Sequence, residues 1–365
     1  MRGLRGGKIV KHGVLQVSRA TGLTALARTL TRNGFNIVGF HGVSLADEHL
    51  RFPTLFISPE AFERRLRFLS RRYRIVPLDA IVEQHRAGRI RPRQVVLTFD
   101  DGFYNFLGAA IPLLKQYGAP ATVYVVTAEV ESGEPLYNLL LRDVILSTKR
   151  SSATGLPHAP ELSCDLSTRR ARDTLLNDAL GYFTATCGTA EERLAFCRTF
   201  AAVLDVDVDA KLRARLWDRL TPSELETVVA AGYDVQLHTH THRNVIRYGD
   251  EVRDEVRTNR QHIERLTGKP AVHFCYPLGL WHRGVWPDLR AEGVESAVTT
   301  RNGPNYPATP PLALRRYLTG QAMTDLEFEF ELSGLRWLTR TVLRPAGRFE
   351  PSEKRLRYAE RPELY

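Results

Sequence analysis

Three histidines stand at every second position in the segment QLHTHTHRN, at His238, His240 and His242. Histidine is a common metal ligand, so the spacing raises the question of how many of the three bind an ion. On an extended strand all three side chains would lie on one face, whereas on a helical turn only His238 and His242 would share a face. In isolation such a motif is more often a set of ordinary core or surface histidines. The backbone conformation and the rest of the chain therefore decide the number of ligands.

Two adjacent carboxylates, Asp100 and Asp101, follow the apolar run VVLTF and precede Gly102, which permits a sharp turn. An Asp-Asp-Gly turn is common on protein surfaces, but neighbouring carboxylates repel each other and a bound cation would relieve that repulsion. The segment DVQLH is also a short strand, which ends at His238, so the two motifs are expected at one end of a sheet. If the chain turns helically there, His242 completes a set of two histidines and one carboxylate, the open kind of site that catalytic metals occupy.

The elements that must position these residues alternate along the chain. Short β-branched runs predict strands at 36–41, 94–99, 121–126, 234–238, 271–277 and 294–300. Between them, segments such as 58–73 and 251–270 keep apolar residues at helical spacing. This alternation predicts an α/β fold with a parallel sheet and helices outside it, either open or closed into a barrel.

The 365 residues, 43% of them hydrophobic, allow one large α/β domain or two smaller ones. We predict a basic helical segment at 1–34, the main domain at 35–320 with a helical insertion at about 130–220, and a basic amphipathic appendage at 321–365. The appendage mixes apolar residues with arginines. It is predicted either to lie on a membrane surface or to pack on its own domain.

The net charge of +10 favours an anionic partner such as phospholipid or acidic glycan, or else reflects a solvated basic face. No DNA- or RNA-binding motif is present, so no nucleic-acid partner is expected. Four cysteines without C-x-x-C spacing favour a reducing compartment. Since Arg19 and Arg28 interrupt the first apolar stretch, which argues against a signal peptide, we predict a cytoplasmic protein or one peripheral to the inner membrane.

Three motifs in order, TFDDG (98–102), HTHTH (238–242) and FCYPLG (274–279), resemble those of the polysaccharide deacetylases. These carbohydrate esterases are related to the nodulation chitooligosaccharide deacetylases. The resemblance extends over roughly residues 36–320 and includes the segments FHGV, GAPATVYVV and SAVTTRNG. It implies a distorted (β/α)₇ barrel as the fold of the main domain.

The same resemblance implies a role for each motif. Asp100 matches the catalytic base, and Asp101, His238 and His242 match the ligands of a divalent metal, most commonly Zn²⁺. His240 then corresponds to the variable position between the two histidine ligands. The expected cofactor is therefore one divalent ion, which can activate water and polarise a carbonyl group.

The third motif is expected to contact the substrate. Leu278 matches the position whose backbone N–H forms part of the oxyanion hole, and such a donor is typically worth about 3 kcal/mol to the transition state. Tyr276 and Gly279 flank it and are assigned with it to substrate binding. Each aromatic and glycine here is equally compatible with ordinary packing at the rim of a barrel.

The sequence departs from the family pattern in two places. Many members supply the general acid from a late Leu-x-His motif, yet no histidine follows His282, and the arginine of the third motif is missing. His41, at the end of the first strand, is the predicted replacement for the acid, although it could also be a buried structural residue. Arg315 or Arg316 is predicted to orient Asp100, with Arg315 assigned to the catalytic set.

The predicted function is metal-dependent hydrolysis of the N-acetyl group of an amino sugar, in a bacterial polysaccharide or a lipid-linked glycan, with release of acetate. An alternative is a catalytically weakened glycan-binding protein of a polysaccharide assembly system. A third, hydrolysis of a non-sugar amide or cyclic imide, is disfavoured because such relatives often lack the complete metal-binding set that this sequence retains.

Overall fold

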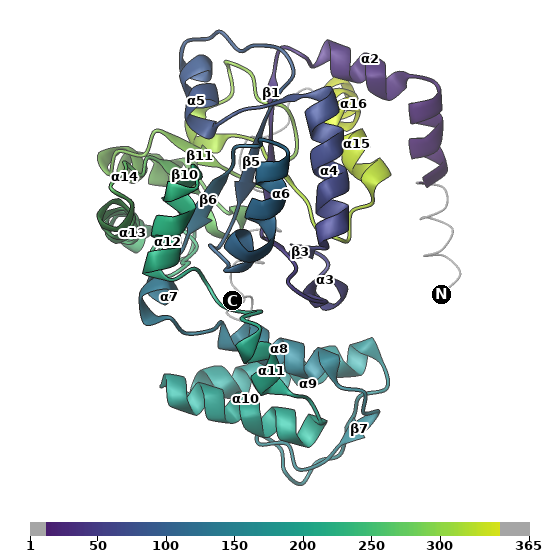
Figure 1. Ribbon diagram of the computed structural model, residues 1–365, viewed down its shortest axis with the longest axis vertical. Coiled ribbons are helices and arrows are strands. Elements are labelled where there is room, and N and C mark those ends of the chain that lie inside the picture. Colours follow the sequence, from purple (N-terminus) through teal and green to yellow (C-terminus); the bar gives the residue numbers. More distant parts are fainter. Residues whose placement is uncertain (1–11, 344–365) are drawn as a thin grey trace.

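The computed structural model describes residues 12–343; residues 1–11 and 344–365, which belong to the two predicted terminal segments, lie outside the described residues. Figure 1 shows an α/β body with a separate group of helices beneath it. The body holds all of the sequence motifs, and the helices beneath it come from the region predicted as an insertion. The boundaries between the predicted domains stay a prediction.

A parallel sheet of eight strands forms the centre of the body. Seven strands follow the order β11-β10-β9-β6-β5-β1-β12, and β4 pairs with β5. Their bounds are β1 (Phe35–Phe40), β4 (Arg74–Ile75), β5 (Gln94–Phe99), β6 (Thr122–Val125), β9 (Asp234–Leu237), β10 (His273–Cys275), β11 (Ser296–Val298) and β12 (Tyr317–Leu318). All residues of β1 and β5 are buried, which explains why these strands read as continuous apolar runs rather than as alternating ones.

The sheet curls until its two ends meet. Val298 of β11 forms a parallel bridge with Leu314, which lies just before β12, and the Thr299 N–H donates to the Leu314 carbonyl at 2.9 Å. The strands therefore enclose a barrel that is narrow and irregular at this closure. The alternation read from the sequence is confirmed as a parallel sheet with helices outside it (Figure 1).

Helices cover the outside of the barrel. They are α4 (Pro59–Arg72), α5 (Leu78–Arg86), α6 (Ile111–Gln116), α12 (Pro222–Ala230), α13 (Val252–Thr267) and α14 (Trp286–Ala291). The Ser58 hydroxyl caps α4 by accepting from the Ala61 N–H, and Phe62 and Leu66 are fully buried on its inner face. Helix α13 ends at Thr267, and its cap is Gly268, whose left-handed backbone (φ 65°) favours glycine.

Short elements fill the loops at the two ends of the barrel. They are β2 (Gly42–Val43), β3 (Phe56–Ile57), α3 (Glu48–Arg51), α7 (Thr127–Ser132), the π-helix η1 (Phe106–Ala110) and the 3₁₀ turns η2 (Gly249–Glu251), η3 (Pro277–Gly279), η4 (Arg283–Val285) and η5 (Pro311–Ala313). Of these, η3 holds the last three residues of the third sequence motif, which begins in β10. It therefore lies directly after β10, at the carboxyl end of a barrel strand.

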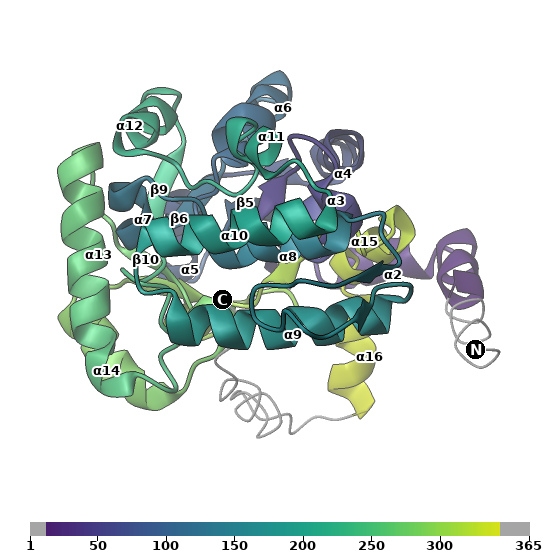
Figure 2. The ribbon, with the colours of Figure 1, turned by 90° about the horizontal axis from the view of Figure 1, so that it is seen from below.

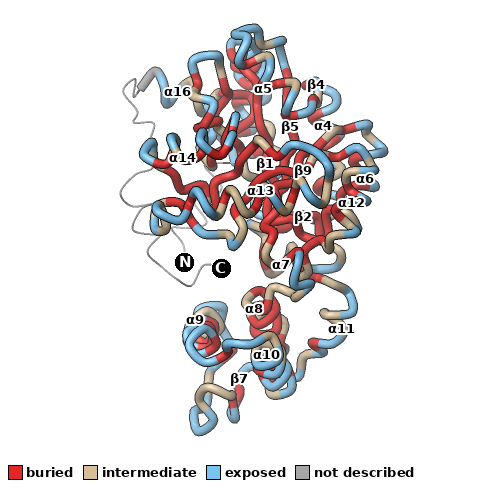
Figure 3. Tube along the Cα trace, turned by 90° about the vertical axis from the view of Figure 1, so that its left-hand side faces the viewer, coloured by how far each residue is buried: buried red, intermediate tan, exposed pale blue. Residues whose placement is uncertain are grey.

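The helical insertion, defined here as α8 to α11, builds its own apolar core. Its elements are α8 (Tyr137–Ser147), the hairpin β7 (Ser152–Ala153) and β8 (Cys164–Asp165), α9 (Arg169–Thr186), α10 (Ala190–Leu204) and α11 (Val208–Arg213). Figure 3 shows buried residues inside these helices, apart from those of the barrel, and Figure 2 shows the helices crossing one end of the body. Phe52, Phe56 and Phe103 of the barrel join this core, so the two parts share an apolar contact.

A buried carboxylate ties the insertion to the barrel. Asp143 of α8 is fully buried and accepts from the Arg51 guanidinium of α3 and from the Trp217 indole N–H at 3.1 Å. The Lys211 ammonium lies 2.8 Å from the same carboxylate. Removing one partner of such a buried cluster typically costs 3–5 kcal/mol because the remaining charge stays desolvated. The insertion is therefore held firmly over the carboxyl ends of the strands.

The described terminal segments lie together on one side of the barrel (Figure 1). Residues 12–20 are helical, and α2 (Leu23–Leu30) contacts both α15 (Asp325–Leu332) and α16 (Leu335–Leu343). Phe328 and Leu332 of α15 are buried against the barrel, so this part of the predicted appendage packs on its own domain. Within residues 12–343, none of the helices combines the length and the apolar character that crossing a bilayer requires.

Candidate metal centre and active site

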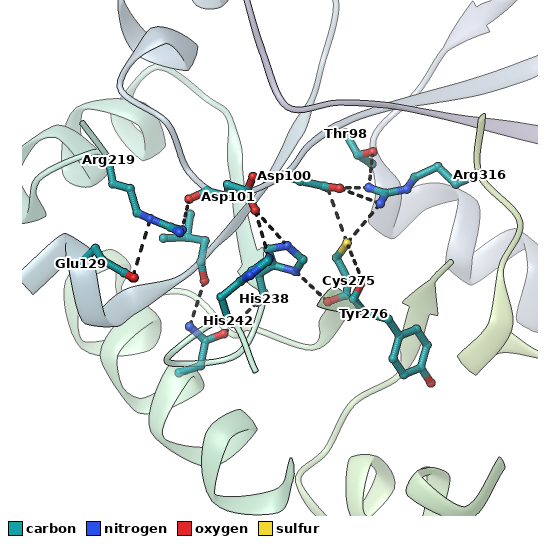
Figure 4. Close-up of polar contacts among 12 residues, drawn as sticks. Thr98, Asp100, Asp101, Glu129, Arg219, His238, His242, Cys275, Tyr276 and Arg316 are labelled. Atoms are coloured by element: carbon teal, nitrogen blue, oxygen red, sulfur yellow. Dashed lines mark hydrogen bonds and ion pairs between the residues drawn. The ribbon is translucent and has the colours of Figure 1, made fainter. Parts of the chain in front are cut away.

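The side chains predicted to do chemistry come from the carboxyl ends of three strands. Asp100 and Asp101 follow β5, His238 follows β9, and His41 follows β1. Figure 4 shows Asp100, Asp101, His238 and His242 converging on one point at the barrel mouth. Parallel strands bring their carboxyl ends to the same edge, which is why residues far apart in the sequence meet there.

Asp101, His238 and His242 form a compact set of metal-ligating atoms. The Asp101 Oδ1 lies 3.3 Å from the His238 Nε2 and 3.4 Å from the His242 Nε2. All three atoms lie within 4.8 Å of one another. Burial raises the pKa of the Asp101 carboxyl, but hydrogen bonds with His238 and His242 outweigh burial and hold that pKa well below its usual value. The carboxylate is therefore anionic and available as a ligand.

The backbone that carries this set is strained. Asp101, Thr239 and His242 have positive φ angles of 70°, 64° and 60°, although none is glycine. Such conformations cost roughly 1–3 kcal/mol each and persist where the surrounding structure enforces them, commonly at functional sites. The segment after His238 is therefore a tight turn rather than a continuing strand, which gives two histidines in the cluster instead of three.

His240, the middle histidine, faces away from the cluster. Its Nδ1 lies 2.9 Å from the Thr127 hydroxyl, and its ring stacks on His262 with centroids 5.2 Å apart. The Ala128 N–H also donates to the His240 carbonyl. His240 therefore fastens the turn to the start of α7, as expected for the position between the two ligands.

The tautomer of His238 shows that the cluster fits a cation. The His238 Nδ1 lies 2.8 Å from the Cys275 carbonyl oxygen, which can only accept, so Nδ1 carries a hydrogen. In a neutral ring Nε2 then directs its lone pair toward the Asp101 carboxylate. Two electron-rich atoms 3.3 Å apart repel each other unless a proton or a cation lies between them. Two imidazole nitrogens and one carboxylate are also a donor set that zinc accepts.

A second group, Asp100, His238 and Cys275, also brings three ligand atoms within 4.8 Å. The Arg316 guanidinium already occupies both Asp100 oxygens, at 2.5 and 2.7 Å, and lies 3.2 Å from the Cys275 sulfur. Burial raises the pKa of the Cys275 thiol, which disfavours the thiolate that a metal needs. A fixed positive charge and a protonated thiol make this group the poorer cation site.

Asp100 is a buried carboxylate held in one orientation by Arg316. Burial raises the pKa of the Asp100 carboxyl, but the charge and hydrogen bonds of Arg316 outweigh burial, so that pKa lies below its usual value. The Arg316 side chain is itself buried, lies just before β12 and also approaches the Thr98 hydroxyl at 3.3 Å. It supplies the positive charge that the third sequence motif lacks.

The structure places Arg315, which the sequence analysis assigned to the catalytic set, away from Asp100. The Arg315 guanidinium donates to the Pro304 carbonyl at 3.0 Å and lies over the Trp337 ring, 5.8 Å from its centroid. Adjacent residues of an extended segment point to opposite sides. Arg316 therefore faces Asp100, whereas Arg315 faces the carboxy-terminal helix.

This difference gives a testable pair of variants. Arg316→Met is expected to leave Asp100 buried without its partner, and to destabilise the protein by about 3–5 kcal/mol while lowering turnover. Arg315→Met removes a half-buried side chain at the opposite face and is expected to change turnover little. Denaturant unfolding and acetate release measured on both proteins test this, and equal loss of activity in the two variants would contradict the assignment of Arg316.

The third motif curves beneath the cluster. Leu278 (φ 59°) and Gly279 (φ 66°) both have left-handed backbones and line the cavity described below. A Cβ on Gly279 would lie 2.2 Å from the Thr300 hydroxyl oxygen, so only glycine fits there. The Tyr276 hydroxyl donates to the Leu312 carbonyl at 2.9 Å, and its ring points away from Asp100 (Figure 4). Tyr276 thus borders the cavity, but its phenol belongs to the core.

His41 lies in the same cavity as the cluster. Within the described part of the chain, its Nδ1 is buried and has no hydrogen-bond partner. A positive charge on the His41 ring lowers the pKa of the Asp100 and Asp101 carboxyls. This effect is smaller than those of Arg316 on Asp100 and of the two histidines on Asp101. A partnerless ring nitrogen beside two carboxylates is suited to moving a proton.

Two residues that support the cluster were missed by the sequence analysis. Asn259 of α13 accepts from the His238 N–H at 2.9 Å and donates to the Val125 carbonyl at 2.9 Å. Arg219, which follows the insertion, donates to the Asp101 carbonyl oxygen at 2.5 Å. A buried asparagine within an amphipathic helix was the only local signal for Asn259, and no motif marks Arg219.

Two cavities meet at the cluster. The larger, about 1370 Å³, runs from Asp101 and His242 between the barrel and the insertion. The smaller, about 380 Å³, contains Arg219 and Arg247 and also reaches Asp101 and His242. The candidate metal centre can therefore be reached from either of two cavities at the barrel mouth.

Comparison with known proteins agrees with this arrangement. The family model for polysaccharide deacetylases matches residues 87–150 and 190–297, which contain all three sequence motifs and also α8, α10 and α11 of the insertion. Poly-β-1,6-N-acetyl-D-glucosamine N-deacetylase from Escherichia coli K12 is 33% identical over 91 residues, 24% of this chain and 13% of that protein. The match thus spans only a small part of that relative.

Solved structures confirm the distorted (β/α)₇ barrel. The Streptococcus pyogenes deacetylase PplD in complex with acetate matches with a TM-score of 0.53 and 16% identity, over 82% of this chain and 97% of that one. IcaB from Ammonifex degensii matches with a TM-score of 0.52, also at 16% identity, over 82% and 97% of the two chains. The family match lies on the segments that build the site, so residues 87–150 and 190–297 are similar to the polysaccharide deacetylase family.

Proposed function

We propose that this protein is a metal-dependent hydrolase that removes the N-acetyl group of an amino sugar in a glycan and releases acetate. The observation that carries the proposal is the close set of Asp101, His238 and His242 beside an Asp100–Arg316 pair, at the floor of a large cavity. Asp101, His238 and His242 supply the metal ligands, so the Asp100 carboxylate is left free for another role. This separation of roles is what hydrolysis of an amide by activated water requires.

Asp101, His238 and His242 would hold the metal. When bound, a divalent ion such as zinc lowers the pKa of water to about 7 and polarises a carbonyl oxygen. Asp100 then acts as general base and accepts the proton of the attacking water. Arg316 keeps both Asp100 oxygens in place, and burial excludes competing solvent from the pair. General-base assistance of this kind is typically worth about 10² to 10⁴ in rate.

Two further groups serve the later steps of the proposed reaction. The Leu278 N–H donates toward the oxygen of the acetyl carbonyl as negative charge develops there. His41 donates a proton to the departing sugar amine as the C–N bond breaks, which replaces the missing late histidine of the family pattern. Water thereby adds to the acetyl carbon, and the products are acetate and the free amino sugar.

The Escherichia coli relative is named as a deacetylase of poly-β-1,6-N-acetyl-D-glucosamine. Oligomers of β-1,6-linked N-acetylglucosamine are therefore the first substrates to test here. We expect acetate release from them, loss of that release after treatment with a chelator, and recovery on addition of zinc, because the ligand set lies at the reacting centre. Activity that persists undiminished after the metal is removed would contradict the proposal.

A glycan-binding protein with weakened catalysis is the second candidate. It is favoured by one observation, the absence of any histidine after His282. This candidate predicts a protein that keeps its metal and binds the oligomers yet releases no acetate from any of them. The absence of a nucleic-acid partner and the cytoplasmic or membrane-peripheral location stay predictions.

A further inference from the structure

Helix α2 presents its largest apolar side chains to solvent. Leu23, Leu26 and Leu30 are 44%, 56% and 63% exposed, whereas its buried face carries Thr24, Ala27 and Arg28. In a helix that only packs on its own domain the arrangement is the reverse, with leucines inside and small or polar residues outside. The exposed leucines at spacings of three and four residues form one continuous stripe.

The preceding helix adds two more exposed apolar residues. In residues 12–20, Val14 and Val17 are 55% and 59% exposed and lie one turn apart. We call these five residues the amino-terminal apolar face: Val14, Val17, Leu23, Leu26 and Leu30. In the described part of the chain, the other strongly exposed large apolar residues are Leu50, Leu162 and Tyr182, far from one another in sequence. A gathered face of this kind marks an interaction surface, whereas scattered residues do not.

The charge of the same segment identifies the partner. Residues 1–34 contain seven lysines and arginines, at positions 2, 5, 8, 11, 19, 28 and 32, and the first acidic residue of the chain is Asp47. The Arg19 side chain is 62% exposed, and Arg32 is exposed beside the stripe. Arg19 and Arg28 approach Glu329 of α15 at 3.5 and 3.9 Å, but the segment has no carboxylate of its own. Exposed leucines in such a basic segment match the boundary between acyl chains and anionic headgroups.

A second copy of this chain fits the face less well. Two amino-terminal apolar faces in contact would bring together two segments of the same positive charge, neither of which contains a carboxylate of its own. An anionic bilayer instead attracts each basic residue with about 1 kcal/mol near its surface. The face also borders the reaction site, because Val14 lines the same cavity as His238.

We propose that the amino-terminal apolar face docks the protein on the surface of an anionic phospholipid bilayer. The face differs from the surface predicted from the sequence, which was the carboxy-terminal appendage. Leu335, Trp337 and Leu338 of α16 are only partly exposed, because α16 packs against α2. The docked protein would hold its cavity next to the membrane.

Vesicle flotation with the purified full-length protein tests the proposal without depending on turnover. The vesicles contain phosphatidylcholine alone or phosphatidylcholine with phosphatidylglycerol. The test variant carries Leu23→Gln, Leu26→Gln and Leu30→Gln, which remove apolar contact and leave the charge unchanged. The control variant carries Leu50→Gln, Leu162→Gln and Tyr182→Gln, matched in number and in exposure.

We expect the wild type and the control variant to float with the anionic vesicles, and less with phosphatidylcholine alone or at high salt. The test variant should lose roughly tenfold or more of its partition coefficient, since each leucine gives up buried apolar surface. No flotation of the wild type, or equal flotation of the test variant, would overturn the proposal. Wild-type dimers that the test variant abolishes, without vesicle binding, would assign the face to a second copy and overturn it as well.

Discussion

The variant His238→Ala is expected to lose stoichiometric metal binding and to reduce acetate release about a thousandfold or more. Loss of an outer-shell partner alone typically costs 10- to 100-fold in metal affinity, and His238 is assigned as a direct ligand. Its removal would leave one carboxylate and one imidazole, too few donors to hold zinc in a stable site. It also deletes the contact to the Cys275 carbonyl that fixes the ring. Metal content by elemental analysis and acetate release measured on the same preparation check this.

His240→Ala is the matched control. It removes a histidine from the same turn, but one whose contacts are the Thr127 hydroxyl and the His262 ring rather than Asp101. We expect this variant to retain its metal and most of its activity. Parallel loss of metal in both variants would mean that the turn, rather than the His238 ligand, controls binding.

The variant Asp100→Asn is expected to keep its metal and to lose about 10² to 10⁴ in kcat. The amide has nearly the same shape as the carboxylate and accepts one hydrogen bond from Arg316, but it cannot accept a proton from water at neutral pH. Asp101, His238 and His242 are unchanged, so the metal content should stay close to that of the wild type. Steady-state kinetics together with metal analysis separate these two effects.

The surface substitution Asp254→Asn serves as the control for the charge change, because its carboxylate is 77% exposed and pairs with Arg257, outside the motifs of the site. We expect wild-type kinetics from it. An Asp100→Asn protein that retains full activity would exclude Asp100 as the base. One that loses its metal would instead make Asp100 a ligand.

The positions of Asp100, Asp101 and His238 could be predicted because they depend on local signals. Each follows a short apolar strand, and parallel strands deliver their carboxyl ends to one edge. The outward direction of His240 also followed from a tight turn, which the positive φ angles of Thr239 and His242 now describe. These features need only the nearest few residues and the rule for parallel sheets.

The choice between Arg315 and Arg316 could not be made in the same way. The segment LALRRYL has two adjacent arginines, and a shift of one residue in register exchanges the side that each faces. The register of β12 is fixed by its pairing with β1, where Tyr317 lies beside Val38. That pairing joins segments almost 280 residues apart, so it cannot be predicted from a local sequence pattern.

The supporting contacts and the exposed face depend on similar long-range packing. Asn259 reaches His238 only because α13 lies beside β9, and Arg219 reaches Asp101 only after the chain returns from the insertion. In the terminal segments, the sequences of α2 and α16 both mix apolar residues with arginines. The contact between these two helices decides which of them remains exposed.

Anomalous diffraction at the zinc absorption edge, from crystals of the zinc-loaded protein, tests the central claim most directly. We expect one strong peak at the barrel mouth, bonded to Asp101, His238 and His242, with Asp100 still paired to Arg316. A peak held instead by Asp100, His238 and Cys275, or no peak near these residues at full zinc loading, would contradict the proposed division between ligands and base.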